Sequence, residues 1–373
     1  MLINQIFEID SCDDVELNIK RTSKLEYRIS YDDEKEMKAI VFIIGGYGAN
    51  ANIYFLDSYR NYIAKNFDVV AVHVFYHCFC QRRSDVEKYS AFTIFTKDDV
   101  SNLSQVLLEI GVNINVNLEN AQQCYELLNQ NITTLKLQGK LVQNYQAKFT
   151  STFIPPNGDY QNYGIMAAID HINALKDLVK RFPKFADLPK IYGGGSYGGY
   201  LSLLIAKIAP WYVDGVIDNS GSALPSPMFI LERESGQCDY FEEYPHNKIG
   251  FFIRTYWNAD VSSKYFFHTE NYLIRIIPNL AHLTIQANVN KNIVLVSYHS
   301  LKDPFNTAKD KQTLFLAYKE LGYDATLHLI KDESEIDGRF IKDLNHGMRI
   351  SDKALFRKEL PLMLEKLQKR KSL

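Results

Sequence analysis

The sequence predicts an α/β fold with a mostly parallel central sheet, helices on both faces of the sheet, and two insertions. Two apolar runs, residues 39–44 and 69–79, are typical of strands that are buried on both faces of a parallel sheet. Residues 51–66 lie between these runs and have helical spacing, so the three segments form a strand–helix–strand unit. A glycine-rich turn at residues 193–199 then joins a short strand to a further helix.

The other elements extend this unit. Residues 1–36 alternate polar and apolar positions, which predicts an opening antiparallel hairpin. Further along the chain, apolar spacing predicts elements at residues 163–181 (helix), 201–210 (helix), 214–220 (strand), 291–300 (strand), 309–323 (helix), 325–330 (strand) and from about Ser351 (helix).

Two blocks interrupt this order. Residues 82–150 are rich in Asn and Gln but too apolar for disorder, which predicts a helical insertion. Residues 226–291 are rich in aromatic residues. We interpret residues 1–373 as one domain whose two insertions form a cap over the carboxyl edge of the sheet, where open α/β sheets bind ligands. The aromatic block fits the wall of a pocket, and fits equally well a cap that packs on its own core.

Composition excludes several classes of partner. The 373 residues are 46% hydrophobic and 23% charged, and 42 basic against 44 acidic residues give a net charge of −2. This balance disfavours nucleic-acid binding. The one basic run, residues 366–371, fits a solvated helix end.

The sequence also predicts a cytoplasmic protein. Its start, MLINQIFEIDSCDD, lacks the basic and apolar regions of a secretory signal, and no apolar run reaches 18 residues, so we expect no membrane partner. The five cysteines are odd in number and scattered, as reduced thiols are: Cys12, Cys78, Cys80, Cys124 and Cys238.

The turn around Ser196 carries the strongest chemical signal. Residues 194–198 read G-x-S-x-G between a strand and a helix, the setting of a nucleophile elbow. Such a turn strains the serine backbone and exposes its Oγ at the carboxyl end of the sheet. Side chains at Gly194 and Gly198 are expected to collide across the turn. The helix start would present the Tyr197 N–H to an oxyanion.

A second glycine loop follows the first buried strand. Gly46, Tyr47 and Gly48 suit an oxyanion loop, with the Tyr47 N–H as the second donor. A phosphate-binding loop is the alternative, but GGYG matches neither GxxxxGK[ST] nor a complete GxGxxG.

An acid and a base follow in the chain order of a Ser–Asp–His triad. Asp303 comes directly after a buried strand, and His346 lies between the last strand and the closing helix. An imidazole takes the serine proton, and a carboxylate orients the imidazolium. Asp218, at another strand end, is the reserve acid.

Other titratable residues have simpler interpretations. His299 and His328 are expected to be structural, and the acidic loop that holds Glu333, Glu335 and Asp337 is expected to be solvated. His77, Cys78 and Cys80 lack the further ligands that a zinc site needs, so we expect no metal and no cofactor.

These motifs resemble the α/β-hydrolase superfamily. GGSYGGY, Asp303-Pro304 and His346-Gly347 are similar to the catalytic domain of prolyl oligopeptidase-like serine hydrolases over residues 38–80, 155–225 and 292–367. Taken whole, the chain also resembles an uncharacterised bacterial family of α/β-hydrolase-like proteins associated with surface-sugar and flagellin-glycan gene sets. Two departures stand out. Gly45 replaces the usual oxyanion-loop histidine, and the chain has no room for the propeller that selects peptides.

The residues and the resemblance together predict a serine hydrolase. The expected reaction is hydrolysis of an acyl ester through an acyl-enzyme, and the resemblance implies an O-acyl sugar as the substrate. Hydrolysis of a small peptide or N-acyl amide is the alternative within the same chemistry. A non-catalytic protein that uses the pocket for binding is the alternative from another class.

Overall fold

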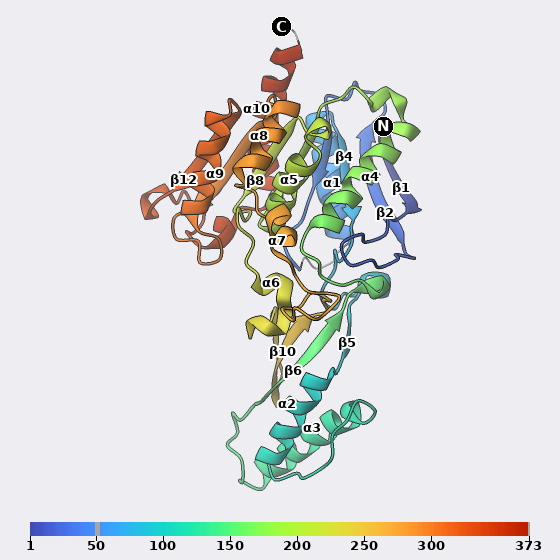
Figure 1. Ribbon diagram of the computed structural model, residues 1–373, viewed down its shortest axis with the longest axis vertical. Helices are drawn as coiled ribbons and strands as arrows, with labels where there is room; N and C mark the ends of the chain where they lie inside the picture. The colour runs from blue at the N-terminus through green and yellow to red at the C-terminus, as the bar shows by residue number, and fades with distance from the viewer. Residues whose placement is uncertain (49–52, 372–373) are drawn as a thin grey trace. The chain divides into compact units, whose positions relative to one another are not determined.

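The computed structural model describes residues 1–48 and 53–371, which form two compact units. The larger unit comprises residues 1–79, 163–225 and 267–373, and the smaller unit comprises residues 80–162 and 226–266. Figure 1 shows the elements of both units.

An eight-stranded sheet forms the centre of the larger unit. Its strand order is β1-β2-β4-β3-β7-β8-β11-β12, parallel from β4 to β12. The strands are β1 (Leu2–Asp10), β2 (Lys24–Asp32), β3 (Ile40–Ile43), β4 (Val70–Phe75), β7 (Lys190–Gly195), β8 (Gly215–Asn219), β11 (Val294–Ser300) and β12 (Asp324–Ile330). The predicted mostly parallel sheet is therefore confirmed.

Helices cover both faces of this sheet. On one face α1 packs against α10, and on the other α4, α5, α8 and α9 follow one another in contact. The helices are α1 (Ile53–Phe67), α4 (Ile165–Arg181), α5 (Tyr197–Ile208), α7 (Thr269–Arg275), α8 (Leu280–Val289), α9 (Ala308–Glu320) and α10 (Asp352–Lys371). This is the α/β-hydrolase fold that the sequence predicts. The first two residues of the helix expected at 51–66 lie outside the described residues.

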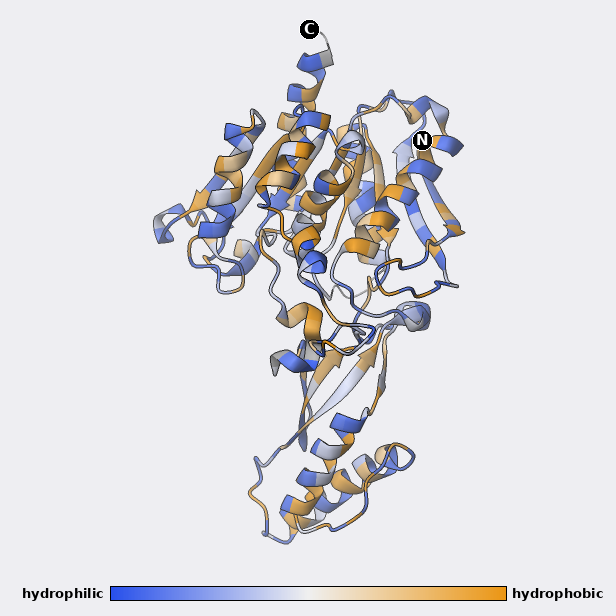
Figure 2. Ribbon diagram, viewed as in Figure 1, coloured by the Kyte–Doolittle hydropathy of each residue, from blue (hydrophilic) through white to orange (hydrophobic). Residues whose placement is uncertain are grey.

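The core explains why the central strands appear as continuous apolar runs. Val41 and Ile43 of β3 belong to the apolar cluster beneath α1 and α10. Phe42 faces the opposite layer, where its ring stacks on Tyr192 with centroids 4.6 Å apart, and His171 of α4 packs against it. Both faces of the strand are thus buried. Figure 2 shows the resulting apolar colouring along these strands.

The opening hairpin lies at the edge of the sheet. β1 and β2 pair antiparallel with Leu2 opposite Asp32, and β2 pairs antiparallel with β4. The outer strand β1 alternates partly buried and exposed residues, as the period-two pattern predicts.

A buried ion pair joins β8 to α9. The Asp218 carboxylate accepts a hydrogen bond from the Lys311 ammonium at 2.6 Å, and both side chains are fully buried. The Ser297 hydroxyl of β11 and the Gly221 N–H donate to the same carboxylate at 2.6 and 2.8 Å. Because every partner comes from a different segment, this carboxylate fixes three elements at the carboxyl end of the sheet.

The smaller unit has a four-stranded sheet of its own. The strand order is β5-β6-β10-β9, with β6 and β10 parallel. Its elements are β5 (Phe92–Ile94), α2 (Lys97–Glu109), α3 (Ala121–Leu137), β6 (Ala147–Ile154), α6 (Met228–Leu231), β9 (Tyr240–Glu243) and β10 (Asn247–Ile253).

An aromatic stack and a buried carboxylate help to hold the smaller unit together. Phe153 of β6 stacks on Phe251 of β10 with centroids 4.2 Å apart. Asp99, buried in the first turn of α2, accepts hydrogen bonds from Thr150 and Thr152 of β6 and pairs with Arg233 at 2.6 Å.

The two predicted insertions contain more than the sequence indicated. Residues 82–150 supply strand β5 and the start of β6 besides two helices. Of residues 226–291, the part from 267 onward, with α7 and α8, belongs to the larger unit. The cap itself stays a prediction.

Across the described ranges, 1–48 and 53–371, each helix is too short or too polar to cross a lipid bilayer.

We predict that Lys311→Met lowers the free energy of unfolding by about 3–5 kcal/mol, because it leaves the Asp218 carboxylate buried and unpaired. Urea denaturation measures the change. Lys309→Met, on the exposed side of the same helix, is the matched control and should change little. Adding Asp218→Asn to Lys311→Met should restore part of the loss. Unchanged stability of Lys311→Met would contradict this account.

Candidate active site

Ser196 occupies a strained turn between β7 and α5. β7 ends at Gly195 and α5 begins at Tyr197, and Ser196 between them has φ 54° and ψ −119°. A serine in this region costs on the order of 1–3 kcal/mol, so the surrounding structure must impose the conformation. The Ser196 N–H donates to the Asn219 carbonyl at 2.7 Å, which fixes one side of the turn to the end of β8.

The glycines of the turn are required by one carbonyl group. A Cβ at Gly194 or at Gly198 would lie 1.9 Å from the Ile44 oxygen, where no atom fits. The contact across the turn is looser, since a Cβ at Gly194 would lie 3.4 Å from the Gly198 Cα. The predicted collision between two side chains across the turn stays a prediction. The limiting contact is with the residue after β3, which brings the second glycine loop against the elbow.

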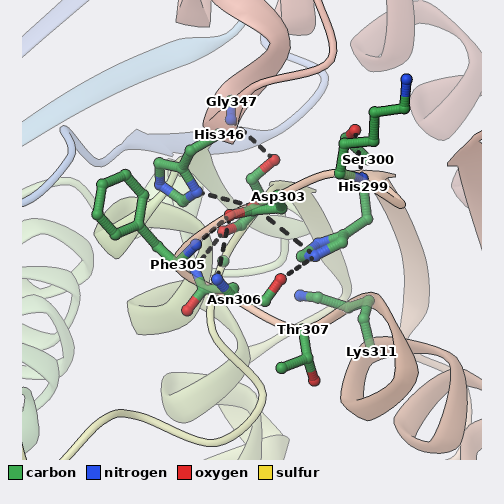
Figure 3. Close-up of polar contacts among 12 residues, drawn as sticks. His299, Ser300, Asp303, Phe305, Asn306, Thr307, Lys311, His346 and Gly347 are labelled. Atoms are coloured by element: carbon green, nitrogen blue, oxygen red, sulfur yellow. Dashed lines mark hydrogen bonds and ion pairs between the residues drawn. The ribbon is translucent and has the colours of Figure 1, made fainter. Parts of the chain in front are cut away.

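The structure brings Ser196, His346 and Asp303 into one hydrogen-bonded chain. His346 Nε2 lies 2.7 Å from Ser196 Oγ, and His346 Nδ1 lies 2.8 Å from Asp303 Oδ2. The three residues come from β7–α5, from the short helical turn His346–Arg349, and from the loop after β11. Figure 3 shows His346 pointing toward Asp303.

Asp303 is held as a carboxylate. Its side chain is fully buried, and its Oδ1 accepts the backbone N–H groups of Phe305 at 2.9 Å and Asn306 at 3.0 Å. Burial acts to raise the pKa of Asp303, but the hydrogen bonds from His346 and these two amides outweigh it and hold the pKa below its ordinary value. Asp303 is therefore ionised throughout the neutral range.

The loop that carries His346 is fixed by polar side chains from neighbouring strand ends. Ser220 Oγ accepts the Gly347 N–H at 3.2 Å, and Asn219 Nδ2 donates to the Gly347 carbonyl at 3.0 Å. The Ser300 hydroxyl donates to the Leu344 carbonyl at 2.6 Å. These contacts hold the residues on both sides of the imidazole.

The acid loop is tied to the same strand end. Asn306 Nδ2 donates to the Ser220 carbonyl at 2.9 Å, so β8 anchors the loops of both His346 and Asp303. The ring of Phe305 packs edge-on against the imidazole with centroids 5.3 Å apart. Sequence reasoning missed these supporting residues. The available signal was the polar run that follows a buried strand, since parallel strands bring their carboxyl ends to one edge.

His299 lies on the other side of Asp303, as Figure 3 shows. Its Nε2 is 2.9 Å from the Asn306 carbonyl and 3.7 Å from Asp303 Oδ2. Burial and the nearby Lys311 ammonium lower the pKa of His299, so the ring is neutral and its Nε2–H donates to Asn306. The histidine is buried and hydrogen-bonded, as the structural interpretation expects, and it packs against the predicted acid.

The reserve acid and the other titratable residues lie outside this chain of hydrogen bonds. Asp218 accepts from Lys311, Ser297 and Gly221 instead of His346. His328 stacks on Tyr298 with centroids 4.4 Å apart. The acidic loop is exposed, and Glu333 pairs there with Lys302.

The proposed oxyanion loop lies against the serine. A Cβ at Gly46 would be 3.6 Å from both Ser196 Cβ and the Gly195 carbonyl oxygen, and Gly48 has φ 63°. The Tyr47 ring packs edge-on against Tyr197 with centroids 5.7 Å apart. Gly45 comes directly after Ile44. The donor roles of the Tyr47 and Tyr197 amides stay predictions.

In the His77–Cys80 segment, the first residue, His77, is hydrogen-bonded within the larger unit. The His77 N–H donates to the Asp170 carboxylate at 2.8 Å, and Asp170 also pairs with Arg21. Within residues 1–48 and 53–371, no three His, Cys, Asp or Glu side chains are grouped so that they could hold a metal ion.

Comparison with known proteins identifies a family. A family model described as "Protein of unknown function (DUF2920)" matches residues 5–373. A search of curated proteins found no match.

Among solved structures, an acylaminoacyl peptidase from Pyrococcus horikoshii matches with 12% identity and a TM-score of 0.48, over 98% of this chain and 41% of that protein. A thermostable carboxyl esterase from Bacillus coagulans matches with 11% identity and a TM-score of 0.46, over 98% of both chains. This chain thus spans about two fifths of the length of the peptidase, 41%. A function for it depends on the geometry of its own site.

We predict that Gly198→Ala destabilises the larger unit strongly, because its Cβ would lie 1.9 Å from the Ile44 oxygen. Thermal unfolding should show a loss of several degrees or a failure to fold. Gly46→Ala is the control for stability, since its Cβ would make ordinary contacts at 3.6 Å. Equal melting temperatures for Gly198→Ala and the wild type would refute the explanation of the elbow glycines.

Proposed function

The chain belongs to the DUF2920 family, whose description names no activity, and we propose from its site that it is a serine hydrolase that cleaves acyl esters. One observation carries the proposal. A strained serine with φ 54° contacts an imidazole at 2.7 Å, and that imidazole contacts a buried carboxylate at 2.8 Å. Nucleophile, base and orienting acid in this geometry are what acyl transfer to serine needs.

The proposed first half-reaction forms an acyl-enzyme. Ser196 Oγ attacks the carbonyl carbon of the ester as its proton passes to His346 Nε2. The carbonyl electron pair moves to oxygen and forms the oxyanion. When this intermediate collapses, the bond between the acyl carbon and the alcohol oxygen breaks, and His346 donates its proton to the leaving alcohol.

Water completes the cycle. It attacks the acyl-enzyme with His346 again as the base, and the acid is released as Ser196 regains its proton. Throughout, Asp303 accepts the Nδ1 hydrogen of His346, which leaves Nε2 free to accept the serine proton. Because hydrogen bonds lower the pKa of Asp303, it remains a negative partner for the imidazolium.

The oxyanion would be stabilised by backbone N–H groups. We assign the Tyr197 amide, at the start of α5, and the Tyr47 amide in the glycine loop. Support comes from Gly46, which brings that loop to van der Waals distance of Ser196. A donor of this kind contributes about 10²–10³ to turnover.

Ester hydrolysis is the favoured reaction, and an O-acyl sugar is the substrate class that the sequence resemblance suggests. Hydrolysis of a small peptide or N-acyl amide uses the same groups and needs only protonation of a leaving amine. A binding protein without catalysis is the outcome if the serine proves unreactive.

We predict that a fluorophosphonate probe labels Ser196 in the wild type. Labelling should disappear in Ser196→Ala and fall by several orders of magnitude in His346→Ala, since the groups act as a unit. Mass spectrometry of the labelled peptide locates the site, and Ser101→Ala, an exposed serine of α2, is the control. Folded wild-type protein that stays unlabelled would favour the binding protein.

We predict that Asp303→Asn lowers kcat/KM for a nitrophenyl ester by about 10⁴, because an amide at this position favours the wrong tautomer of His346. Asp218→Asn should retain far more activity, and its effect should follow its loss of stability. Steady-state kinetics with melting temperatures measure both. A crippled Asp218→Asn beside an unaffected Asp303→Asn would overturn the assignment of the acid.

We predict that short-chain nitrophenyl esters and O-acetyl sugars are hydrolysed faster than aminoacyl anilides and N-acetyl amides. The comparison is of kcat/KM for each class, with Ser196→Ala as the blank. Higher kcat/KM for the amides would replace the esterase with the amide hydrolase.

A further inference from the structure

The carboxylate of Asp352 lies beside the turn at Ser196 and is not part of the proposed triad. Asp352 is the first residue of α10, and Ser351 before it caps that helix by accepting the Ala354 N–H at 3.2 Å. An acidic residue in a first helical turn usually favours the helix dipole while it faces solvent. The Asp352 side chain instead leaves the helix, and its Oδ1 accepts the Gly195 N–H at 2.9 Å.

The sheet explains why Gly195 needs this acceptor. β3 ends at Ile43, which is level with Gly193 of β7, and the last backbone bond between the two segments runs from the Ile44 N–H to the Gly193 carbonyl at 2.8 Å. Two residues later, the Gly195 N–H faces the same side as Gly193, beyond the end of β3. The Asp352 carboxylate takes the place that a strand carbonyl would fill.

The peptide groups around Ser196 are therefore held from two sides. On the side of β8, the Ser196 N–H donates to the Asn219 carbonyl at 2.7 Å. On the side of β3, the Gly195 N–H donates to Asp352. Between these two anchors lies the residue with φ 54°, whose conformation local preference would not maintain.

Two influences act on the pKa of Asp352: burial and the hydrogen bond from the Gly195 N–H. Burial raises the pKa of the Tyr59 phenol in α1, and the negative charge of the nearby Asp352 raises it further. Lys353 places its ammonium 4.0 Å from the ring centroid of Tyr62. Asn219 presents its amide on the side of Gly195. Within the part of the chain that the structure describes, Asp352 forms no ion pair. Its specific partner is the Gly195 N–H, which donates a hydrogen bond to it.

We propose that Asp352 is a positioning residue of the elbow: its carboxylate fixes the Gly194–Gly195 peptide and, through it, the backbone of the nucleophile. The inference rests on the proposed function of Ser196. It also predicts a dependence on pH. Burial raises the pKa of Asp352 to about 6, although the Gly195 N–H opposes this. As pH falls through that value the carboxylate gains a proton, and the charge-assisted hydrogen bond becomes an ordinary one.

Two substitutions separate the hydrogen bond from the charge. Asp352→Asn keeps an oxygen acceptor for Gly195, whereas Asp352→Ala removes it. We expect Asp352→Ala to lower kcat/KM for a nitrophenyl ester at least about tenfold at pH 8, mainly through kcat, and Asp352→Asn to lose only a few-fold. Asp310→Asn and Asp310→Ala, in the first turn of α9, are the matched controls. Wild-type turnover should also approach that of Asp352→Asn below about pH 6, where both side chains are neutral.

Two kinetic results would overturn the proposal. One is an Asp352→Ala variant with wild-type kcat/KM, and the other is an Asp352→Asn variant as slow as Asp352→Ala at pH 8. The ratio of kcat/KM for wild type to that for Asp352→Asn is taken at each pH, because it cancels the pH effects that both proteins share. Melting temperatures of all four variants show whether a rate loss merely follows a loss of stability, which would also count against the proposal.

A second measurement does not depend on catalysis. Selective ¹⁵N-glycine labelling gives spectra of only 19 residues, in which the Gly195 amide is assigned by its loss in Gly195→Ala. In a His346→Ala background, the Gly195 proton shift should titrate with a midpoint near 6, and Asp352→Asn should abolish the titration. A pH-independent Gly195 shift would reject the anchor. Absence of probe labelling in the wild type would reject only the proposed function.

Discussion

The close contact between the Ile44 carbonyl and the turn at Ser196 is the constraint on which the site depends. The residue after β3 approaches the elbow so closely that only hydrogen atoms fit at Gly194 and Gly198. This contact joins two segments that are about 150 residues apart in the sequence, at residues 44 and 194. It also places the glycine loop over the serine. The strain at Ser196 is then a consequence of packing, because the turn has no room to relax toward an ordinary conformation.

The strand ends supply the rest of the framework. Ser196, the proposed nucleophile, follows β7. β8 ends at Asn219, with Ser220 directly after it, and the loop after β11 carries Asp303. The side chains and carbonyls at the end of β8 hold Ser196, the loop of His346 and the loop of Asp303 at once. Parallel neighbours make this possible, since they bring their carboxyl ends to one edge. The buried pair of Asp218 and Lys311 locks that edge from within the core.

Local patterns were enough to predict the central sheet and the three residues of the proposed triad. Apolar runs gave the buried strands, and the order of Ser196, Asp303 and His346 indicated their meeting. The smaller unit was harder. Its strands β6 and β10 pair across about 100 residues of chain, with residue 147 opposite residue 247. In addition, a run such as Thr150–Thr152 lacks the apolar residues that indicate a buried strand. Nor could spacing identify the partner of Gly194 and Gly198, because the Ile44 oxygen belongs to a backbone and leaves no mark in the sequence.

Three aspartates at this edge of the sheet show how different surroundings give the same type of side chain different roles. Asp218 is enclosed with an ammonium and two further donors, so it serves the fold. Asp303 is equally buried, but two amides and an imidazole keep its pKa low, which suits a permanent negative partner for a base. Asp352 has a single amide as its donor, and burial raises its pKa to about 6. Burial raises and hydrogen bonds lower the pKa of both Asp303 and Asp352, and the balance differs between the two positions. The Asp352 carboxylate therefore exchanges its proton near pH 6, and its donor, Gly195, is the residue next to Ser196, the proposed nucleophile.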